Sequence, residues 1–284
     1  MSEQEATWLY AVVPAAGIGP AGAGAPGPTG PTGPTGPGGP AGPGVGTGGV
    51  AGEPVRLVES AGLAAVVGSV PLAEVAEEPL RRHLRDPAWL ARTARRHHRV
   101  VTTFARSVPT VPFRLATVYR TDARVRELLA RRRERLLAAL DTVRARAEWG
   151  VQAYAPGGGT AAAERPEPGD TAPGSGTEYL LRARAERIRR EQARQRVSAA
   201  VREIESTLEP LAVAARSQPH PAAPAGPDRT GQLVLSVSYL VDERDRDRFL
   251  ERTGRLATGF PELRLRVTGP WPAYSFVEIG AEPQ

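Results

Sequence analysis

Three tracts rich in glycine and proline divide the sequence and limit what the rest of it can fold into. They span about residues 15–54, 156–176 and 219–231. Proline lacks an amide hydrogen and has a fixed φ, and glycine loses the most conformational entropy on ordering, so helices and central strands do not continue through such tracts. Between them the chain is rich in Leu, Val, Ala and Arg with regular apolar spacing. We therefore expect globular segments interrupted by three loops.

The first tract contains a repeat in which glycine occupies every third position from Gly24 to Gly42, so that seven triplets span residues 24–44. Gly-X-Y repeats form the collagen triple helix, but here three chains would have to meet within a globular domain. The tract also matches G-x-G-x-x-G at residues 17–22 and 22–27. The prolines that follow prevent the helix that a dinucleotide site requires. We interpret the tract as an extended spacer between two strands.

Composition excludes several chemistries. The chain has no cysteine, and all 37 of its basic residues are arginine. Disulfides, cysteine-bound metals, a Walker A lysine and a Schiff-base lysine are therefore excluded. The formal net charge is +6 with 31 acidic residues interspersed, which is weak support for nucleic-acid binding. The start of the chain lacks the pattern of a secretory signal, and no apolar run approaches the ~20 residues that span a bilayer, so we expect a cytoplasmic location.

Apolar spacing predicts the secondary structure. In the first half it predicts strands at 7–13, 55–60 and 62–70, with a tight turn at 60–62, helices at 87–106 and 122–147, a short helix or pair of turns at 71–84, and an extended segment at 107–119. In the second half it predicts strands at 148–155, 232–241, 263–269 and 273–279 and helices at 178–215 and 242–258. The order of the second half fits an antiparallel sheet with helices on one face, so the predicted fold class is α+β.

Catalytic motifs are not apparent. His97 and His98 are adjacent, and neighbouring positions on a helix point about 100° apart, so they do not clamp one metal ion. We expect one of them to be packed and the other exposed. The acidic residues lie on helix surfaces beside arginines, which is typical of solvated faces. We predict no catalytic, cofactor-binding or metal-binding residue.

Arginine clusters on two predicted helices are candidate binding surfaces. The run at 131–135 lies on the helix 122–147, and the first half of the helix 178–215 is charged nearly all round. Contact with phosphate is one interpretation, but glutamates share the helix and no aromatic residues are interleaved. A solvated face, or a face that docks an acidic protein, is favoured. The candidate residues are Arg131, Arg132, Arg135, Arg189 and Arg190.

The segment TGPWPAYSF at 268–276 is unusual because two prolines flank a tryptophan. The prolines restrict the backbone around Trp271, and Tyr274 follows closely. Structurally, such a segment is a crossover that fills a core, which is the favoured interpretation. Functionally, a rigid aromatic knob suits protein recognition. Trp271 and Tyr274 are therefore also candidate partner-binding residues.

Six segments in order resemble one protein family. They are WLYAVV, VRLVESAGLAAVVGSVP, VPFRLATVYRTDARVRELL, EWGVQAYA, YLLRARAE and LRLRVTGPWPAYSFV. Together they are similar to the GvpF/GvpL family of gas vesicle proteins over nearly the whole chain apart from the three tracts. The segments Pro-Phe-Arg-x-x-Thr-Val and Gly-Pro-Trp-Pro-x-Tyr-Ser-Phe are the most specific. The choice between F-type and L-type stays open.

The resemblance implies a fold and a role. It implies two α+β domains, here 1–147 with an insertion at about 15–53, and 148–284 with loops at about 156–176 and 218–231. The second domain would be a modified ferredoxin-like sheet. The implied role is a non-enzymatic accessory or minor structural protein that supports gas vesicle assembly in the cytoplasm. Its partners would be the shell protein and other gas vesicle proteins, with no cofactor, nucleic acid, membrane or small-molecule substrate. A basic nucleic-acid-binding protein and an enzyme with an unrecognised acid/base site are the alternatives.

Overall fold

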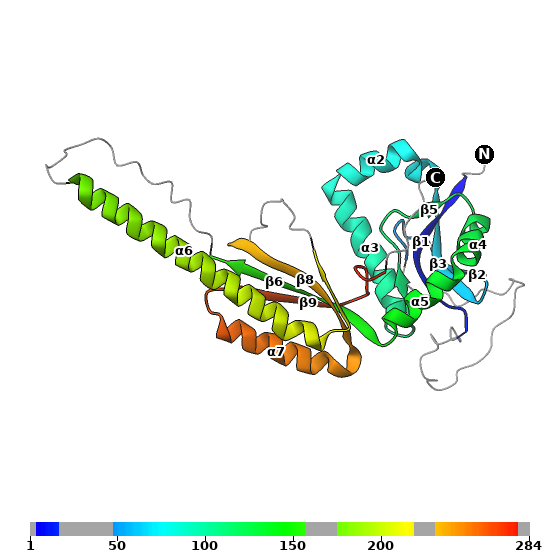
Figure 1. Cartoon of the computed structure of the whole chain (residues 1–284). Coiled ribbons are helices and arrows are strands. Elements are labelled where there is room, and N and C mark those ends of the chain that lie inside the picture. Colours follow the sequence, from blue (N-terminus) through cyan, green and yellow to red (C-terminus); the bar gives the residue numbers. More distant parts are fainter. Residues whose placement is uncertain (1–3, 17–47, 157–174, 219–230, 278–284) are drawn as a thin grey trace, which may run out of the picture. The chain divides into compact units, whose positions relative to one another are not determined.

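The computed structural model describes residues 4–16, 48–156, 175–218 and 231–277 (Figure 1). The chain divides into two compact units. Unit 1 consists of Met1–Arg146 together with Trp271–Gln284, and unit 2 of Ala147–Pro270. The Gly-X-Y repeat lies outside the described residues, as does most of the two later glycine- and proline-rich tracts.

Unit 1 is built on an antiparallel sheet whose central strand is β1 (Glu5–Pro14). β1 pairs with β3 (Leu63–Pro71), which pairs in turn with β2 (Val55–Ser60). On its other side β1 pairs with the short strands β4 (Val111–Pro112) and β5 (Val118–Tyr119). Nearly every residue of β1 is buried, which explains why its sequence is apolar without alternation.

The turn between β2 and β3 has the geometry that its sequence predicts. Ser60 pairs with Leu63, so only Ala61 and Gly62 form the turn. Both have positive φ, 54° and 78°, as a two-residue type I′ hairpin turn requires. The predicted pair of strands joined by a tight turn is confirmed.

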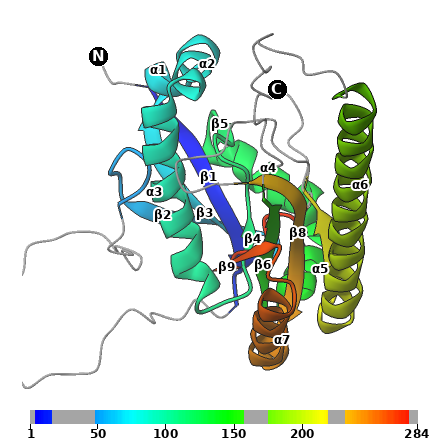
Figure 2. The same cartoon turned by 90° about the vertical axis from the view of Figure 1, so that its left-hand side faces the viewer.

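Five helices accompany this sheet: α1 (Leu72–Val75), α2 (Glu77–Arg85), α3 (Pro87–Ala105), α4 (Asp122–Arg131) and α5 (Arg133–Val143). α3 begins as predicted, because the Asp86 side chain accepts a hydrogen bond from the amide of Ala88 and Pro87 opens the helix. Figures 1 and 2 show α3 on one side of the sheet and α4 on the other, which buries both faces of β1.

Two stretches of unit 1 that were predicted as helical each contain two helices. The predicted helix 122–147 is wrong, because α4 and α5 are separated at Arg132 and α5 ends at Val143. Residues 130–135 contribute no buried apolar side chain, so no apolar packing favours a continuous helix through this stretch. Residues 71–84, predicted as a short helix or a pair of turns, contain α1 and most of α2, which are separated at Ala76, whose ψ of 157° is extended.

The main elements of unit 2 follow the order strand, helix, strand, strand, helix, strand. Its sheet has the order β7-β8-β6-β9, which together with this element order is the ferredoxin-like arrangement. The α+β fold class is therefore confirmed. The elements are β6 (Arg146–Ala155), α6 (Ser175–Leu208), β7 (Ala214–Ser217), β8 (Gln232–Asp242), α7 (Arg246–Gly259) and β9 (Arg264–Trp271).

One face of this sheet is covered by both long helices. Alternate residues of β6 and β8 point to that face, where they meet buried residues of α6 and α7 (Figure 1). The core contains Trp149, Val151 and Ala153 from β6, Leu235, Val237 and Tyr239 from β8, Ile204 and Leu208 from α6, and Phe249 and Leu256 from α7.

The helix α6 ends earlier than predicted. It stops at Leu208 rather than near Ala215, and a short 3-10 helix, Glu209–Leu211, follows. Pro210 lies in that turn and cannot continue an α-helix. The chain then pairs with β8, beginning with the amide of Val213 on the carbonyl of Leu240 at 2.7 Å, so sequence analysis missed the edge strand β7.

The predicted strand 273–279 is wrong as far as the structure describes it. Residues 273–277 form a turn without strand pairing, closed by the amide of Tyr274 on the carbonyl of Pro272 at 2.7 Å. Two prolines precede this turn and remove donors that a strand would use. Residues 278 and 279 lie outside the described part of the chain.

Candidate partner-binding surfaces

The segment after β9 returns the chain to unit 1. The Trp271 ring meets the His98 ring edge-on, with 5.0 Å between centroids, and the Tyr274 ring lies 6.1 Å from the same imidazole. Tyr274 packs against the unit 1 core, and Ala273 and Phe276 are buried. Trp271 itself stays 41% exposed. The segment therefore fills a core while it presents one large aromatic ring at the surface.

Gly269 sets the path of the chain just before Trp271. Its φ is 132°, and a Cβ added there would lie 2.8 Å from the carbonyl oxygen of Glu148 and 3.0 Å from Trp149 Cε3. Real Cβ atoms avoid the first distance, and L-residues avoid this φ. Glycine is thus required at this position for a steric reason that concerns unit 2.

The two adjacent histidines have different surroundings. Trp8 Nε1 donates to His97 Nδ1 at 3.1 Å, so Nε2 carries the proton and donates to the carbonyl of Phe113 at 3.1 Å. Burial lowers the pKa of His97 to about 4. His98 is half-buried rather than exposed, Thr102 Oγ1 lies 3.2 Å from its Nε2, and burial lowers its pKa as well. His97 is the packed histidine that the sequence predicts, and its hydrogen bonds are structural.

The first group of candidate arginines surrounds the break between α4 and α5. Arg131 ends α4, Arg132 lies between the helices and Arg135 is in the first turns of α5. Arg131 and Arg135 are exposed and Arg132 is half-buried. Arg133 is tied to the β2–β3 turn, because its Nε donates to the carbonyl of Ala61 at 3.0 Å. That tether fixes the start of α5 and leaves Arg131 and Arg135 at the surface.

The second group lies on α6 in unit 2. Arg189 is exposed and its Nε donates to the carbonyl of Ala185 at 3.4 Å, while Arg190 forms an ion pair with Glu186. The seven predicted residues therefore lie in three groups on different elements. Trp271 and Tyr274 both lie against one imidazole, that of His98 on α3.

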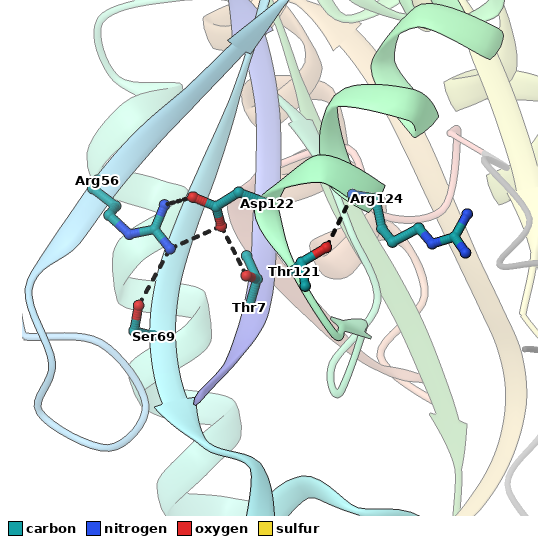
Figure 3. Close-up of polar contacts among 6 residues, drawn as sticks. All are labelled: Thr7, Arg56, Ser69, Thr121, Asp122 and Arg124. Carbon is teal, nitrogen blue, oxygen red and sulfur yellow. Dashed lines mark hydrogen bonds and ion pairs between the residues drawn. The ribbon is translucent and has the colours of Figure 1, made fainter. Parts of the chain in front are cut away.

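A polar network that sequence analysis missed joins three strands to α4 (Figure 3). Arg56 of β2 binds Asp122 with both guanidinium nitrogens, at 2.7 and 2.9 Å, and also donates to Ser69 Oγ at 3.2 Å. Thr7 Oγ1 of β1 donates to the same carboxylate at 2.8 Å. Thr121, not Asp122, caps α4 by accepting from the amide of Arg124, which leaves Asp122 to hold the sheet.

The charge state of Asp122 follows from these contacts. Desolvation would raise its pKa, but hydrogen bonds from Arg56 and Thr7 outweigh it, so the pKa of Asp122 lies below its usual value. The carboxylate thus stays ionised at neutral pH. The Thr-Asp pair at a predicted helix start was visible in the sequence, but its partner 66 residues away was not.

A second missed cluster lies near the end of the first tract, at residues 49–53, and ties these residues to β1. Tyr10 donates to Glu53 Oε1 at 2.5 Å and accepts from the amide of Val50 at 2.8 Å. Burial, with the neighbouring Glu53, raises the pKa of Tyr10. A Cβ on Gly49 would collide with this pair, at 1.9 Å from Glu53 Oε1 and 2.5 Å from the Tyr10 hydroxyl. Residues 49–53 are therefore a folded part of unit 1.

Among the residues that the structure describes, no three His, Asp or Glu side chains gather where they would hold a metal ion. Within the same ranges, each helix is either too short or too polar to cross a lipid bilayer.

Comparison with known proteins identifies the family. The family model "Gas vesicle synthesis protein GvpL/GvpF" matches residues 6–278. Gas vesicle protein L of Streptomyces sp. (strain CB03234) is 37% identical over 238 residues, 84% of this chain and 88% of that protein. Gas vesicle protein F of the same strain is 28% identical over 235 residues, 80% of this chain and 89% of that protein.

The fold agrees with a solved relative. The crystal structure of the gas vesicle protein GvpF from Anabaena sp. PCC7120 superposes with a TM-score of 0.60 at 14% identity, over 99% of each chain. At that identity the likeness shows the fold. The sequence match over nearly the whole length shows more: the chain belongs to the GvpL/GvpF family of gas vesicle proteins.

Proposed function

We propose that this chain is a non-enzymatic protein that supports gas vesicle assembly in the cytoplasm, through contacts with the shell protein and other gas vesicle proteins. The observation that carries the proposal is the family match over residues 6–278, which includes both units. The higher identity to the L protein than to the F protein of one strain, 37% against 28%, supports an L-type role. The buried polar groups of unit 1 support the non-enzymatic part of the proposal, because their hydrogen bonds serve to hold strands and helices together.

The surfaces that would make these contacts are the exposed ring of Trp271 and the arginines around the α4–α5 break. Trp271 has a large apolar face held by a buried segment, which lowers the entropy cost of binding. Arg131 and Arg135 are exposed and suit acidic surfaces.

Gene deletion in a vesicle-producing host tests the function. We expect loss or strong reduction of vesicles in electron micrographs, with recovery when the full-length gene is restored. Normal vesicles in normal number in the deletion strain would refute an assembly role.

Replacing Trp271 with alanine tests the surface. Because the ring is 41% exposed, we expect a stability loss of about 1–2 kcal/mol, below that of a buried tryptophan, and weaker pull-down of the shell protein. Leu84→Ala is a matched control, since Leu84 is also 41% exposed but lies on α2. Equal pull-down by wild type and both variants would exclude Trp271 as a contact.

A further inference from the structure

The part of α6 from residue 179 to residue 196, where the structure describes burial, is exposed throughout. α6 has 34 residues, which at 1.5 Å per residue is about 51 Å of helix. Every residue from Tyr179 to Arg196 is exposed, and burial begins at Val197. Figure 1 shows this half of α6 extending beyond the sheet of unit 2. We call residues 179–196 the α6 arm.

The arm has apolar residues on the side opposite the core. The core stripe of α6 starts at Val197, whereas Leu181, Ala185 and Ile188 lie about 120° to 180° around the helix from it. Leu181 is 60% exposed and Ile188 47% exposed. Their spacing of 4 and 3 continues through two glutamines, so the set repeats as the a and d positions of a coiled coil. This set, the α6 seam, is Leu181, Ala185, Ile188, Gln192, Gln195 and Ala199.

One flank of the α6 seam carries only positive charge at the positions next to the seam. Arg182, Arg189 and Arg196 each follow a d position of the seam, so arginine occupies all three e positions. Across the whole arm there are seven arginines and two glutamates. Charges at e and g positions set the choice of partner in coiled coils, and rows of arginine favour acidic residues opposite them.

We propose that the α6 seam binds an amphipathic helix of another protein that carries glutamate or aspartate beside its apolar stripe. A second copy of this chain fits less well, because antiparallel pairing of two seams places the arginine rows against each other. Two glutamines in the seam weaken its apolar contact, so the association is reversible. This inference rests on the proposed function, since it specifies one surface for contacts with other gas vesicle proteins.

A designed peptide tests the surface directly. The probe is a fluorescent helical peptide of three heptads with leucine at a and d and glutamate at e and g. A second peptide of the same design carries lysine in place of glutamate at e and g. Fluorescence anisotropy with the full-length chain measures binding. We expect the acidic peptide to bind and the basic one not to bind. Absence of acidic-peptide binding overturns the proposal.

Two charge-matched triple variants make the test specific. The seam variant carries Arg182→Glu, Arg189→Glu and Arg196→Glu. The control carries Arg187→Glu, Arg190→Glu and Arg194→Glu, which remove the same charge from the side away from the seam. We expect the seam variant to lose at least about tenfold in affinity for the acidic peptide and to gain binding of the basic one, with the control within about twofold of wild type. Equal losses in both variants would show unspecific charge attraction and overturn the seam.

Further measurements distinguish the proposed helix from other molecules that could bind the α6 seam. Leu181→Asp with Ile188→Asp should abolish peptide binding while circular dichroism stays unchanged. Dimerisation that this pair abolishes would assign the seam to a second copy and overturn the proposal. If duplex DNA bound more tightly than the acidic peptide, the seam would be assigned to nucleic acid and the proposal would be overturned. In the deletion strain, normal vesicles restored by the seam variant would refute the inference but leave the proposed function standing.

Discussion

His97 makes the stability of unit 1 depend on pH. Both imidazole nitrogens are engaged, one accepting from Trp8 and the other donating to Phe113, so a second proton on Nδ1 would face the indole N–H. Burial accordingly lowers the pKa of His97 from 6.5 to about 4. The unfolded chain binds the proton more tightly, so stability is unaffected above about pH 6.5 and falls as the pH drops from there toward 4. Between about pH 7.5 and pH 5 the loss is about 2 kcal/mol.

The variant His97→Gln isolates this effect, because glutamine retains one acceptor and one donor but does not titrate. Hydrogen exchange of peptides from β1 and α3 measures the unfolding free energy of unit 1 separately from unit 2. The other histidines are present in both proteins, so their contributions cancel in the comparison. We expect wild type to lose about 2 kcal/mol more than the variant between the two pH values. Equal losses, or an NMR titration of His97 near 6.5, would refute the reasoning.

Three further predictions concern positions that the structure constrains. Asp122→Asn should lower stability by about 1–2 kcal/mol, with a smaller loss in high salt, measured by thermal unfolding, because the ion pair it breaks is partly exposed. Gly269→Ala should destabilise unit 2 by about 2 kcal/mol or more, whereas Gly254→Ala, a helical position with open space, should stabilise it by up to about 1 kcal/mol; equal urea midpoints would contradict this. Deleting residues 22–47 should leave the protein folded, but Gly49→Ala should lower its melting temperature, because the clash at Gly49 lies in a folded cluster.

The parts of the fold that could be predicted are those set by local pattern. The continuous apolar run of β1, the Asp-Pro start of α3 and the Ala-Gly turn after β2 each carry their signal within a few residues. The break at Arg132 was missed because it depends on what the helix packs against. The early end of α6 had a local signal in Pro210, but the apolar spacing that continues to Leu211 was given more weight. Regular apolar spacing shows which residues could pack on one helix face, but it does not show whether a core lies opposite that face.

The polar contacts needed information that one sequence does not contain. Asp122 meets Arg56 across 66 positions, and Trp8 meets His97 across 89. Nothing local distinguishes these residues from solvated ones. The arginine candidates have the opposite difficulty, since residue type and spacing identify them readily but one sequence does not show what they bind.

The return of the chain to unit 1 after β9 has a consequence for biosynthesis. Unit 2 is encoded between two parts of unit 1, so Tyr274 and Phe276 are synthesised only after unit 2. Until then, the part of the unit 1 core against which Tyr274 packs is uncovered. A stop before Trp271 would therefore expose apolar surface on the part of unit 1 that is synthesised first.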